Sequence, residues 1–183
     1  PDTLVVIDEC YFELSQVTAK DLIKKYNNLI ILRSFSKIFG LAGLRLGYII
    51  SNPSIIRYCN ALQQNNQPFS VNRFALASGM AVMNDFSKIN RVTEKYKKAK
   101  NDFEKMLMNI KCLEIVPTNT TFSLVKLPKS YAASFIKNEL LKSGIYIKDC
   151  SIYYGLGSKY IYLGTPKKTV QQKFINKLIS ILC

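Results

Sequence analysis

One lysine lies in an otherwise apolar, glycine-rich stretch, RSFSKIFGLAGLRLGYII, which covers residues 33–50. A lysine amine with its ordinary pKa of about 10.4 is protonated near neutral pH and is a poor nucleophile. Desolvation lowers that pKa, and this is how lysines that form Schiff bases become reactive. The neighbours of Lys37 are apolar, Phe35 and Ile38 among them, so the sequence predicts a desolvated amine.

Groups that suit a phosphate accompany this lysine. Ser34 and Ser36 carry hydroxyls on the same turn, and Arg45 follows in the glycine-rich part. An arginine fork matches phosphate oxygens. A carbonyl-reactive lysine beside phosphate-binding groups is what pyridoxal phosphate requires. The residues therefore predict pyridoxal phosphate as the cofactor.

Two further polar residues follow the apolar run TLVVID. Asp8 ends this predicted strand, where a buried carboxylate is costly unless a cation meets it. A pyridinium nitrogen would meet it, and the carboxylate would keep that nitrogen protonated. Tyr11 could place its phenol near O3′ of the ring. Because ligands bind at the strand ends of α/β sheets, we expect both residues to lie near Lys37.

Strands and helices alternate in the first half of the chain. TLVVID, NLIILR and LGYII predict strands buried on both faces, with a helix over TAKDLIKKY between the first two. Asn52 and Pro53 predict the start of a further helix. This alternation predicts an α/β layer with a mostly parallel sheet.

The second half has a different pattern. A helix over SVNRFALASGMAVMNDF and a long amphipathic helix over residues 87–110 are followed by short strands, a helix over AASFIKNELLKSG and a closing helix from Pro166. These elements predict a separate α+β unit. We place the domain boundary between residues 90 and 91.

The composition narrows the possible chemistry. The net charge is +14, which would suit a nucleic acid partner. The lysines, however, alternate with acidic and amide residues as on exposed helix faces, so we predict no nucleic acid partner. The chain has no histidine, which excludes Ser-His-Asp and Cys-His catalysis and argues against a zinc or other metal site.

The sequence also indicates a compartment. The five cysteines are widely spaced without a CxxC pair, as is typical of a reducing cytoplasm. No apolar run approaches the roughly 20 residues that span a bilayer, and no signal peptide pattern is present. We therefore predict a cytoplasmic protein with no membrane partner. The chain starts on a strand-like run without methionine, so we expect it to be a piece of a longer chain.

Together these motifs resemble the class I/II aminotransferases of fold type I, and among them the histidinol-phosphate aminotransferase-like branch. That family has a strand-end Asp with a Tyr three residues later, followed by S/T-x-S-K and G-L-A-G-x-R-x-G-Y. VVIDECYFEL and SFSKIFGLAGLRLGY match this pattern, and QPFSVNRFALASGMAVMND, PTNTTFSLVKL, SGIYIKDCS and YLGTP follow in the family's order. The resemblance covers residues 3 to about 180.

The resemblance implies an enzyme, a pyridoxal-phosphate-dependent aminotransferase acting on a small phosphorylated amine or amino acid, and a homodimer. Residues 1–90 would form the C-terminal part of the large cofactor domain, and residues 91–183 the small C-terminal domain. Lys37 would be the Schiff-base lysine that also moves the proton. The implied cofactor contacts are Asp8 to the pyridine nitrogen, Tyr11 to O3′, and Ser34, Ser36 and Arg45 to the phosphate. Because other family contacts lie upstream of Asp8, we expect this chain alone to be inactive.

Three positions depart from the family pattern. Tyr160 stands where the family usually has an arginine that grips the substrate carboxylate, four residues before the glycine of GTP. Lys148 replaces another arginine, in GIYIKD, and Thr121 replaces a common asparagine. Lys148 and Tyr160 are therefore candidate substrate-binding residues, and a substrate without an α-carboxylate becomes more plausible. Lys148 and Lys159 are either point charges for a phosphorylated substrate or surface lysines.

Several alternatives stay open at this point. QPFSVN and KDCSIYYGL resemble threonine-phosphate decarboxylases, so a pyridoxal-phosphate-dependent decarboxylase of a phosphorylated amino acid is the main alternative. A basic nucleic-acid-binding module and a non-catalytic relative that keeps the fold are the others. The sequence names neither the amino donor nor the acceptor.

Overall fold

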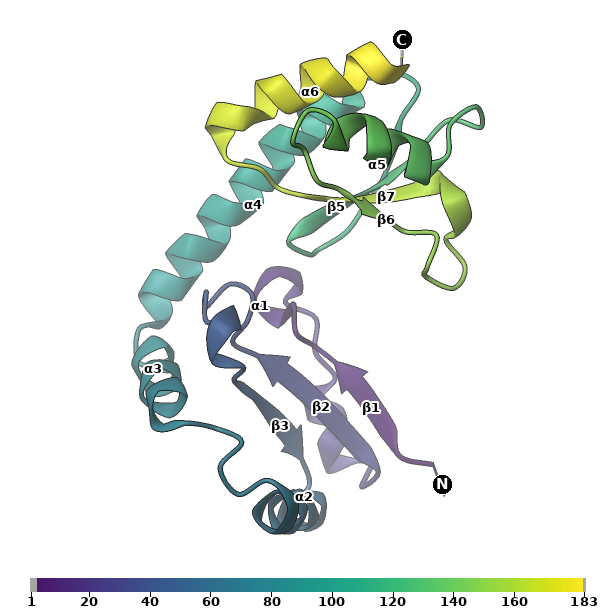
Figure 1. Cartoon of the computed structure of the whole chain (residues 1–183). Helices are drawn as coiled ribbons and strands as arrows, with labels where there is room; N and C mark the ends of the chain where they lie inside the picture. Colours follow the sequence, from purple (N-terminus) through teal and green to yellow (C-terminus); the bar gives the residue numbers. More distant parts are fainter. Residues whose placement is uncertain (1–2, 183) are drawn as a thin grey trace. The chain divides into compact units, whose positions relative to one another are not determined.

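A computed structural model describes residues 3–182. The chain divides after Glu94 into two compact units, each with its own β-sheet (Figure 1). This division and the predicted boundary after residue 90 both fall within one helix, α4 (Phe86–Met108). The assignment of the two units to a large and a small domain stays a prediction.

The sheet of the first unit has the order β1-β2-β3. β1 (Val5–Asp8) runs parallel to β2 (Leu29–Ser34), and β3 (Gly47–Ser51) runs antiparallel to β2. The connection between β2 and β3 contains only a short 3-10 turn, η2 (Ala42–Leu44). Without a crossover helix the chain returns antiparallel. The described sheet of the first unit therefore contains one parallel and one antiparallel pairing, whereas the sequence predicted a mostly parallel sheet.

The predicted burial of β1 and β3 on both faces is wrong for the described residues. Leu4, Val5 and Val6 are 54%, 44% and 53% exposed, and Ile49 on β3 is 38% exposed. Within the described sheet of the first unit, only the central strand β2 has a strand on each side, and Leu29–Ile31 at its start are buried. An apolar run in the sequence predicts a strand, but the burial of its side chains also depends on which elements pack against that strand.

Two of the helices predicted from the sequence are present in the first unit. The Asn52 side chain accepts hydrogen bonds from the backbone N–H groups of Ser54 and Ile55, at 3.0 and 3.1 Å, and thereby caps α2 (Pro53–Asn66). α3 (Arg73–Met83) is also present. A helical turn, α1 (Phe12–Ser15), was not predicted, and the predicted helix over residues 18–26 is a 3-10 turn, η1 (Lys20–Lys24).

The second unit is an antiparallel sheet of order β4-β5-β7-β6. Its helices cover one face of the sheet (Figure 1). The side chains that face them are buried, including Val125, Ile161 and Leu163. The remaining elements are β4 (Glu114–Val116), β5 (Phe122–Lys126), α5 (Ala133–Leu141), β6 (Lys148–Asp149), η3 (Gly157–Lys159), β7 (Tyr160–Gly164) and α6 (Lys168–Leu182). Among the described residues, none of the helices has the length and apolar character needed to cross a membrane.

Candidate functional site

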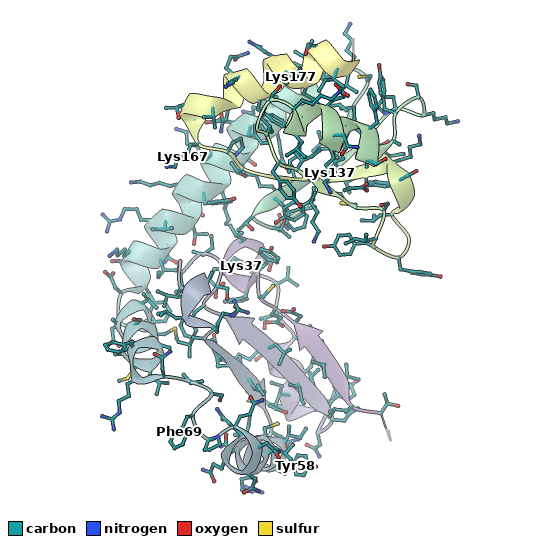
Figure 2. The ribbon with its side chains drawn as sticks, in the orientation of Figure 1. Lys37, Tyr58, Phe69, Lys137, Lys167 and Lys177 are labelled. Carbon is teal, nitrogen blue, oxygen red and sulfur yellow. The ribbon has the colours of Figure 1, made fainter. Side chains whose placement is uncertain are left out.

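Lys37 lies just beyond the carboxyl end of β2, in the first unit (Figure 2). The neighbouring strand β1 ends beside it, because Asp8 is paired with Leu32 and the Glu9 N–H donates to the Leu32 carbonyl at 2.9 Å. The Lys37 Nζ is 5.1 Å from the centre of the Tyr11 ring. The structure therefore brings Lys37 and Tyr11 together at the two strand ends.

Asp8 lies in the same electrostatic neighbourhood. Its Oδ1 accepts a hydrogen bond from the Cys10 N–H at 2.9 Å. Burial raises the pKa of the Cys10 thiol, the Asp8 charge raises it further, and the Lys37 ammonium opposes the shift. One thiol therefore senses both of the oppositely charged groups that the sequence placed at this sheet edge.

Two expectations about this site are wrong for the described structure. Asp8 is exposed and not buried, because β1 is an edge strand of the described sheet and has a neighbouring strand, β2, on one side only. Lys37 is exposed as well, whereas its neighbours Phe35 and Ile38 are 6% and 7% exposed. The apolar residues around the lysine point into the core of the unit and leave the amine in solvent.

The three predicted phosphate ligands share the loop that joins β2 to β3. The Ser34 Oγ accepts from the Ser36 N–H at 3.1 Å, which folds the first turn of the loop. Arg45 is exposed and has a positive φ of 52°, a strained conformation for a residue other than glycine. Its Nη1 donates to the Ala42 carbonyl at 3.0 Å. Among the described residues no hydrogen bond or ion pair joins Arg45 to either serine, so the three share a loop without a direct contact.

The loop closes at Gly47, where the backbones of β2 and β3 approach closely. A Cβ at this position would lie 2.8 Å from the Arg33 carbonyl oxygen. Only glycine therefore fits here, and the loop returns directly beside Ser34, which is paired with Gly47.

Sequence reasoning missed an ion pair directly beside these residues. The Glu9 Oε2 lies 2.8 Å from Arg33 Nε and 2.7 Å from Arg33 Nη2, and both side chains are 6% exposed. Burial also raises the pKa of Glu13 on the adjacent turn α1, an effect that Arg33 opposes. A signal was available, because Glu9 and Arg33 are the charged residues that adjoin Asp8 and Ser34 at the ends of two apolar runs.

The two candidate substrate residues lie in the second unit. Lys148 on β6 is paired with Tyr162 on β7, and its Nζ donates to the Tyr153 hydroxyl. This hydrogen bond raises the pKa of Lys148. Tyr160 lies two residues before Tyr162 on the same strand, so both side chains are on one face of the sheet. The structure thus places Lys148 and Tyr160 on neighbouring strands, and among the described residues no hydrogen bond or ion pair joins the two.

Lys159 has a different environment. Its Nζ donates to the backbone carbonyls of Lys129 and Tyr131, at 2.8 and 2.9 Å. These contacts tie η3 to the segment before α5. They favour a structural role for the Lys159 charge over a substrate contact.

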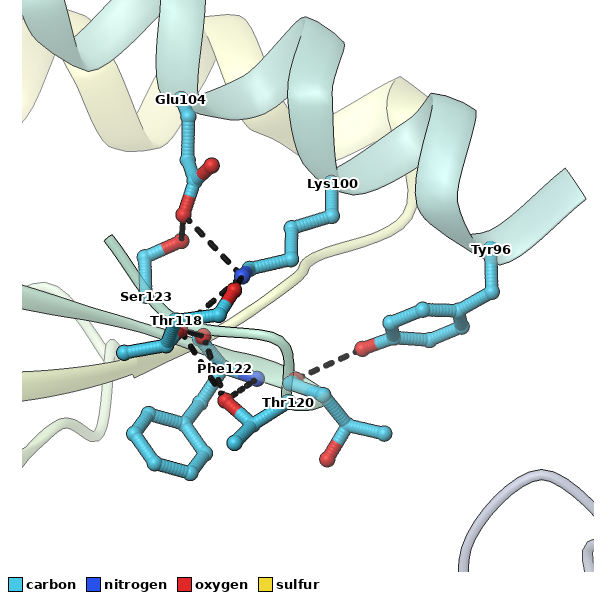
Figure 3. Close-up of polar contacts among 8 residues, drawn as sticks. Tyr96, Lys100, Glu104, Thr118, Thr120, Phe122 and Ser123 are labelled. Atoms are coloured by element: carbon cyan, nitrogen blue, oxygen red, sulfur yellow. Dashed lines mark hydrogen bonds and ion pairs between the residues drawn. The ribbon is translucent and has the colours of Figure 1, made fainter. Parts of the chain in front are cut away.

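The loop that carries Thr121 is anchored to α4 (Figure 3). The buried Lys100 ammonium donates to the Thr118 carbonyl and to its hydroxyl, the latter at 2.9 Å. It also lies 3.4 Å from Glu104. The Tyr96 hydroxyl donates to the Thr121 carbonyl at 2.7 Å. Thr121 is therefore held by its backbone, on a loop fixed by a buried cation.

Comparisons with known proteins agree with this architecture. The family described as aminotransferase class I and II matches residues 2–163. A histidinol-phosphate aminotransferase of Methanosphaera stadtmanae is 35% identical over 182 residues, which cover 99% of this chain and 49% of that protein. The chain therefore spans about half the length of the curated relatives that it matches.

Solved structures share the fold. The L-threonine-O-3-phosphate decarboxylase of Porphyromonas gingivalis is 29% identical with a TM-score of 0.81, and the match covers 100% of this chain and 56% of that chain. The histidinol-phosphate aminotransferase of Sinorhizobium meliloti, in complex with pyridoxal-5'-phosphate, is 25% identical with a TM-score of 0.82. That match covers 98% of this chain and 50% of the solved one.

Proposed function

This chain belongs to the class I and II aminotransferases, and we propose that the full-length protein transfers amino groups with pyridoxal phosphate as cofactor. The observation that carries the proposal is the Lys37 amine, 5.1 Å from the Tyr11 ring centre and within the electrostatic range of the thiol that also senses Asp8. The Lys37 amine, the Tyr11 ring and the Asp8 carboxylate lie at the ends of the neighbouring strands β1 and β2. Enzymes of this family use pyridoxal phosphate, and the residues present suit it.

The donor set of the first unit fits the cofactor group by group. Lys37 supplies the amine that reacts with a carbonyl, Asp8 a carboxylate for a pyridinium nitrogen, and Tyr11 a phenol. The phosphate ligands would be the two hydroxyls and the guanidinium of the β2–β3 loop, Ser34, Ser36 and Arg45. When bound, the cofactor supplies an electron sink. The Lys37 Nζ, 5.1 Å from the centre of the Tyr11 ring, would hold and return the proton that the substrate carbon loses.

We further propose that the substrate is a small phosphorylated amine or amino acid. The support is the 35% identity to a histidinol-phosphate aminotransferase, together with Lys148. The Tyr153 hydroxyl raises the pKa of Lys148, so this lysine keeps its positive charge. Tyr160 offers a neutral hydroxyl for a substrate group other than a carboxylate.

A decarboxylase is the second candidate. The decarboxylase of Porphyromonas gingivalis is 29% identical to this chain and shares its fold. Transamination and decarboxylation use the same cofactor and differ in the substrate bond that breaks, so substrate assays of the full-length protein separate the two.

The test compares two reactions of the full-length protein. We expect amino transfer from histidinol phosphate to a 2-oxo acid, and no release of carbon dioxide from L-threonine O-3-phosphate. Carbon dioxide release without amino transfer would instead support the decarboxylase. Lys37→Ala is expected to abolish either activity, whereas Lys88→Ala, at an exposed position of α4, serves as the matched lysine control.

We also propose that the full-length protein is a homodimer in the cytoplasm. Large apolar side chains are exposed on α2 and α3, which suits an interface between subunits. They are Tyr58, Leu62, Phe74, Leu76 and Met80, at 67%, 44%, 81%, 50% and 69% exposure. The described cysteines are free thiols, as expected in a reducing compartment. Light scattering of the full-length protein tests the dimer, and a monomeric mass at micromolar concentration would contradict it.

A further inference from the structure

A buried ion pair links the two strand ends that carry the candidate cofactor ligands. Glu9 directly follows Asp8, and Arg33 directly precedes Ser34. Their side chains meet through both Arg33 Nε and Nη2, at 2.8 and 2.7 Å from Glu9 Oε2. Each side chain is 6% exposed. The pair therefore joins β1 to β2 by side chains at the point where the backbone pairing of the strands ends.

Both side chains of the pair also have partners outside it. The second oxygen of Glu9, Oε1, accepts from the Ala19 N–H at 2.7 Å, and Arg33 Nη2 donates to the Thr18 hydroxyl at 3.1 Å. The Arg33 guanidinium lies over the Phe12 ring, 3.5 Å from its centre. Thus one pair of charges fixes both strand ends, the turn α1 and the loop that follows α1.

A buried pair of this kind is a poor source of stability. Removing two charges from water is costly, and apolar replacements of similar size are often as stable or more so. What the pair does supply is a definite geometry, since each of its contacts has a preferred direction. The pair of Glu114 and Lys126 in the same chain is instead open to water, because its side chains are 64% and 42% exposed.

We propose that Glu9 and Arg33 are positioning residues for the cofactor. They hold Asp8 and Tyr11 at the end of β1 against Ser34, Ser36 and Lys37 at the end of β2, so that both groups contact one bound molecule. This inference rests on the proposed function for the identity of that molecule. The geometry of the strand ends itself does not depend on it.

The test uses three variants of the full-length protein and two readouts. Glu9→Gln and Arg33→Lys keep the side-chain sizes similar, and Glu9→Met combined with Arg33→Met replaces the pair by apolar groups. Hydrogen exchange of the cofactor-free protein reports local order, and titration with pyridoxal phosphate reports affinity. Glu114→Gln is the matched control, because it removes a carboxylate from an exposed pair.

We expect each variant to bind pyridoxal phosphate about tenfold more weakly or worse, as for residues that orient ligands of a bound group. Amide exchange should accelerate at residues 8–12 and 34–41, and the double variant should keep the melting temperature of the parent. Glu114→Gln should change neither readout. A folded double variant with the affinity and exchange of the parent would overturn the proposal, and so would loosening confined to residues 16–20.

The two proposals fail in different ways. If the parent protein binds no pyridoxal phosphate, the proposed function fails, and exchange at the two strand ends then decides only whether the ion pair orders them. If the parent binds the cofactor and the variants bind it equally well, only the positioning role fails.

Discussion

The two sheets of this protein are stabilised in different ways. In the second unit three helices contribute to one continuous apolar core, in which Phe103, Leu107 and Ile161 are at most 1% exposed. In the first unit the outer strands keep apolar side chains in solvent, including Val5 and Val6. Its buried cluster beside the glycine-rich loop is small and centres on Phe35, Leu46 and Ala75.

The unit with the larger apolar core is therefore not the unit that carries most of the candidate reactive groups. The second unit buries enough apolar surface to define its own structure. The first unit carries most of the candidate reactive groups, and their order depends on specific devices: a buried ion pair, a close backbone approach at Gly47 and a strained Arg45. Four predictions test this contrast, from the largest effect to the smallest.

The largest effect is expected in the core of the second unit. Phe103→Ala removes a ring that packs 5.7 Å from the Phe174 ring, and should lower the free energy of unfolding of this unit by about 3–5 kcal/mol. Phe69 in the first unit is 92% exposed, so Phe69→Ala should change stability by less than about 0.5 kcal/mol. Hydrogen exchange of the 183-residue chain, resolved by segment, measures both. Equal losses for the two phenylalanines would remove the contrast between the units.

A smaller effect is expected at the glycine-rich loop. Gly47→Ala places a methyl group 2.8 Å from the Arg33 carbonyl, and should destabilise the first unit by about 1–3 kcal/mol. Gly43→Ala is the matched control, because a Cβ there meets nothing within 4 Å. Thermal unfolding of both variants checks the prediction. A Gly47→Ala protein as stable as Gly43→Ala would show that β2 and β3 do not approach as closely as described.

The positions of the site residues at the ends of two strands could be predicted from the sequence. The site residues Asp8, Tyr11 and Lys37 follow apolar runs, and the pattern of the runs indicates strands whose ends meet at one edge. The helix cap at Asn52 could also be predicted from the sequence. An Asn followed by Pro favours the start of a helix for reasons that depend only on these neighbouring residues.

What the sequence could not supply is the environment of these residues. The exposure of Lys37 and Asp8 depends on which strands lie beside β1 and on the rotation of Phe35 and Ile38 into the core. Glu9 and Arg33 each stand at the end of an apolar run, but their contacts join positions 24 residues apart, so the runs indicate the two charges and not their pairing. In the second half of the chain the amphipathic periodicity of residues 87–110 predicted a long helix, which α4 (Phe86–Met108) confirms.

A pH-dependent effect is expected at Glu13. Burial raises the pKa of this carboxyl, so the folded protein binds its proton more tightly than the unfolded chain does. The contribution of Glu13 to stability is therefore fully present below its ordinary pKa and is lost as the pH rises through the raised value. Glu13→Gln should gain stability relative to the parent as the pH increases from 3.5 to 7. Melting temperatures across this range measure the difference, and a pH-independent difference would contradict the assignment.

The smallest effect concerns the reactivity of Cys10. Its thiol pKa is raised by burial and by Asp8, and is lowered by Lys37. Asp8→Asn should therefore speed alkylation of Cys10 at neutral pH, and Lys37→Met should slow it. The exposed Cys112 serves as the internal reference. Identical rates in both variants would mean that the two charges do not share one neighbourhood.

The most direct test of the central claim is to locate the cofactor on the polypeptide. The full-length protein is supplied with pyridoxal phosphate, reduced with borohydride and digested for peptide mapping by mass spectrometry. We predict one pyridoxyl group, on Lys37. A folded, cofactor-supplied protein in which Lys37 stays unmodified would contradict the account.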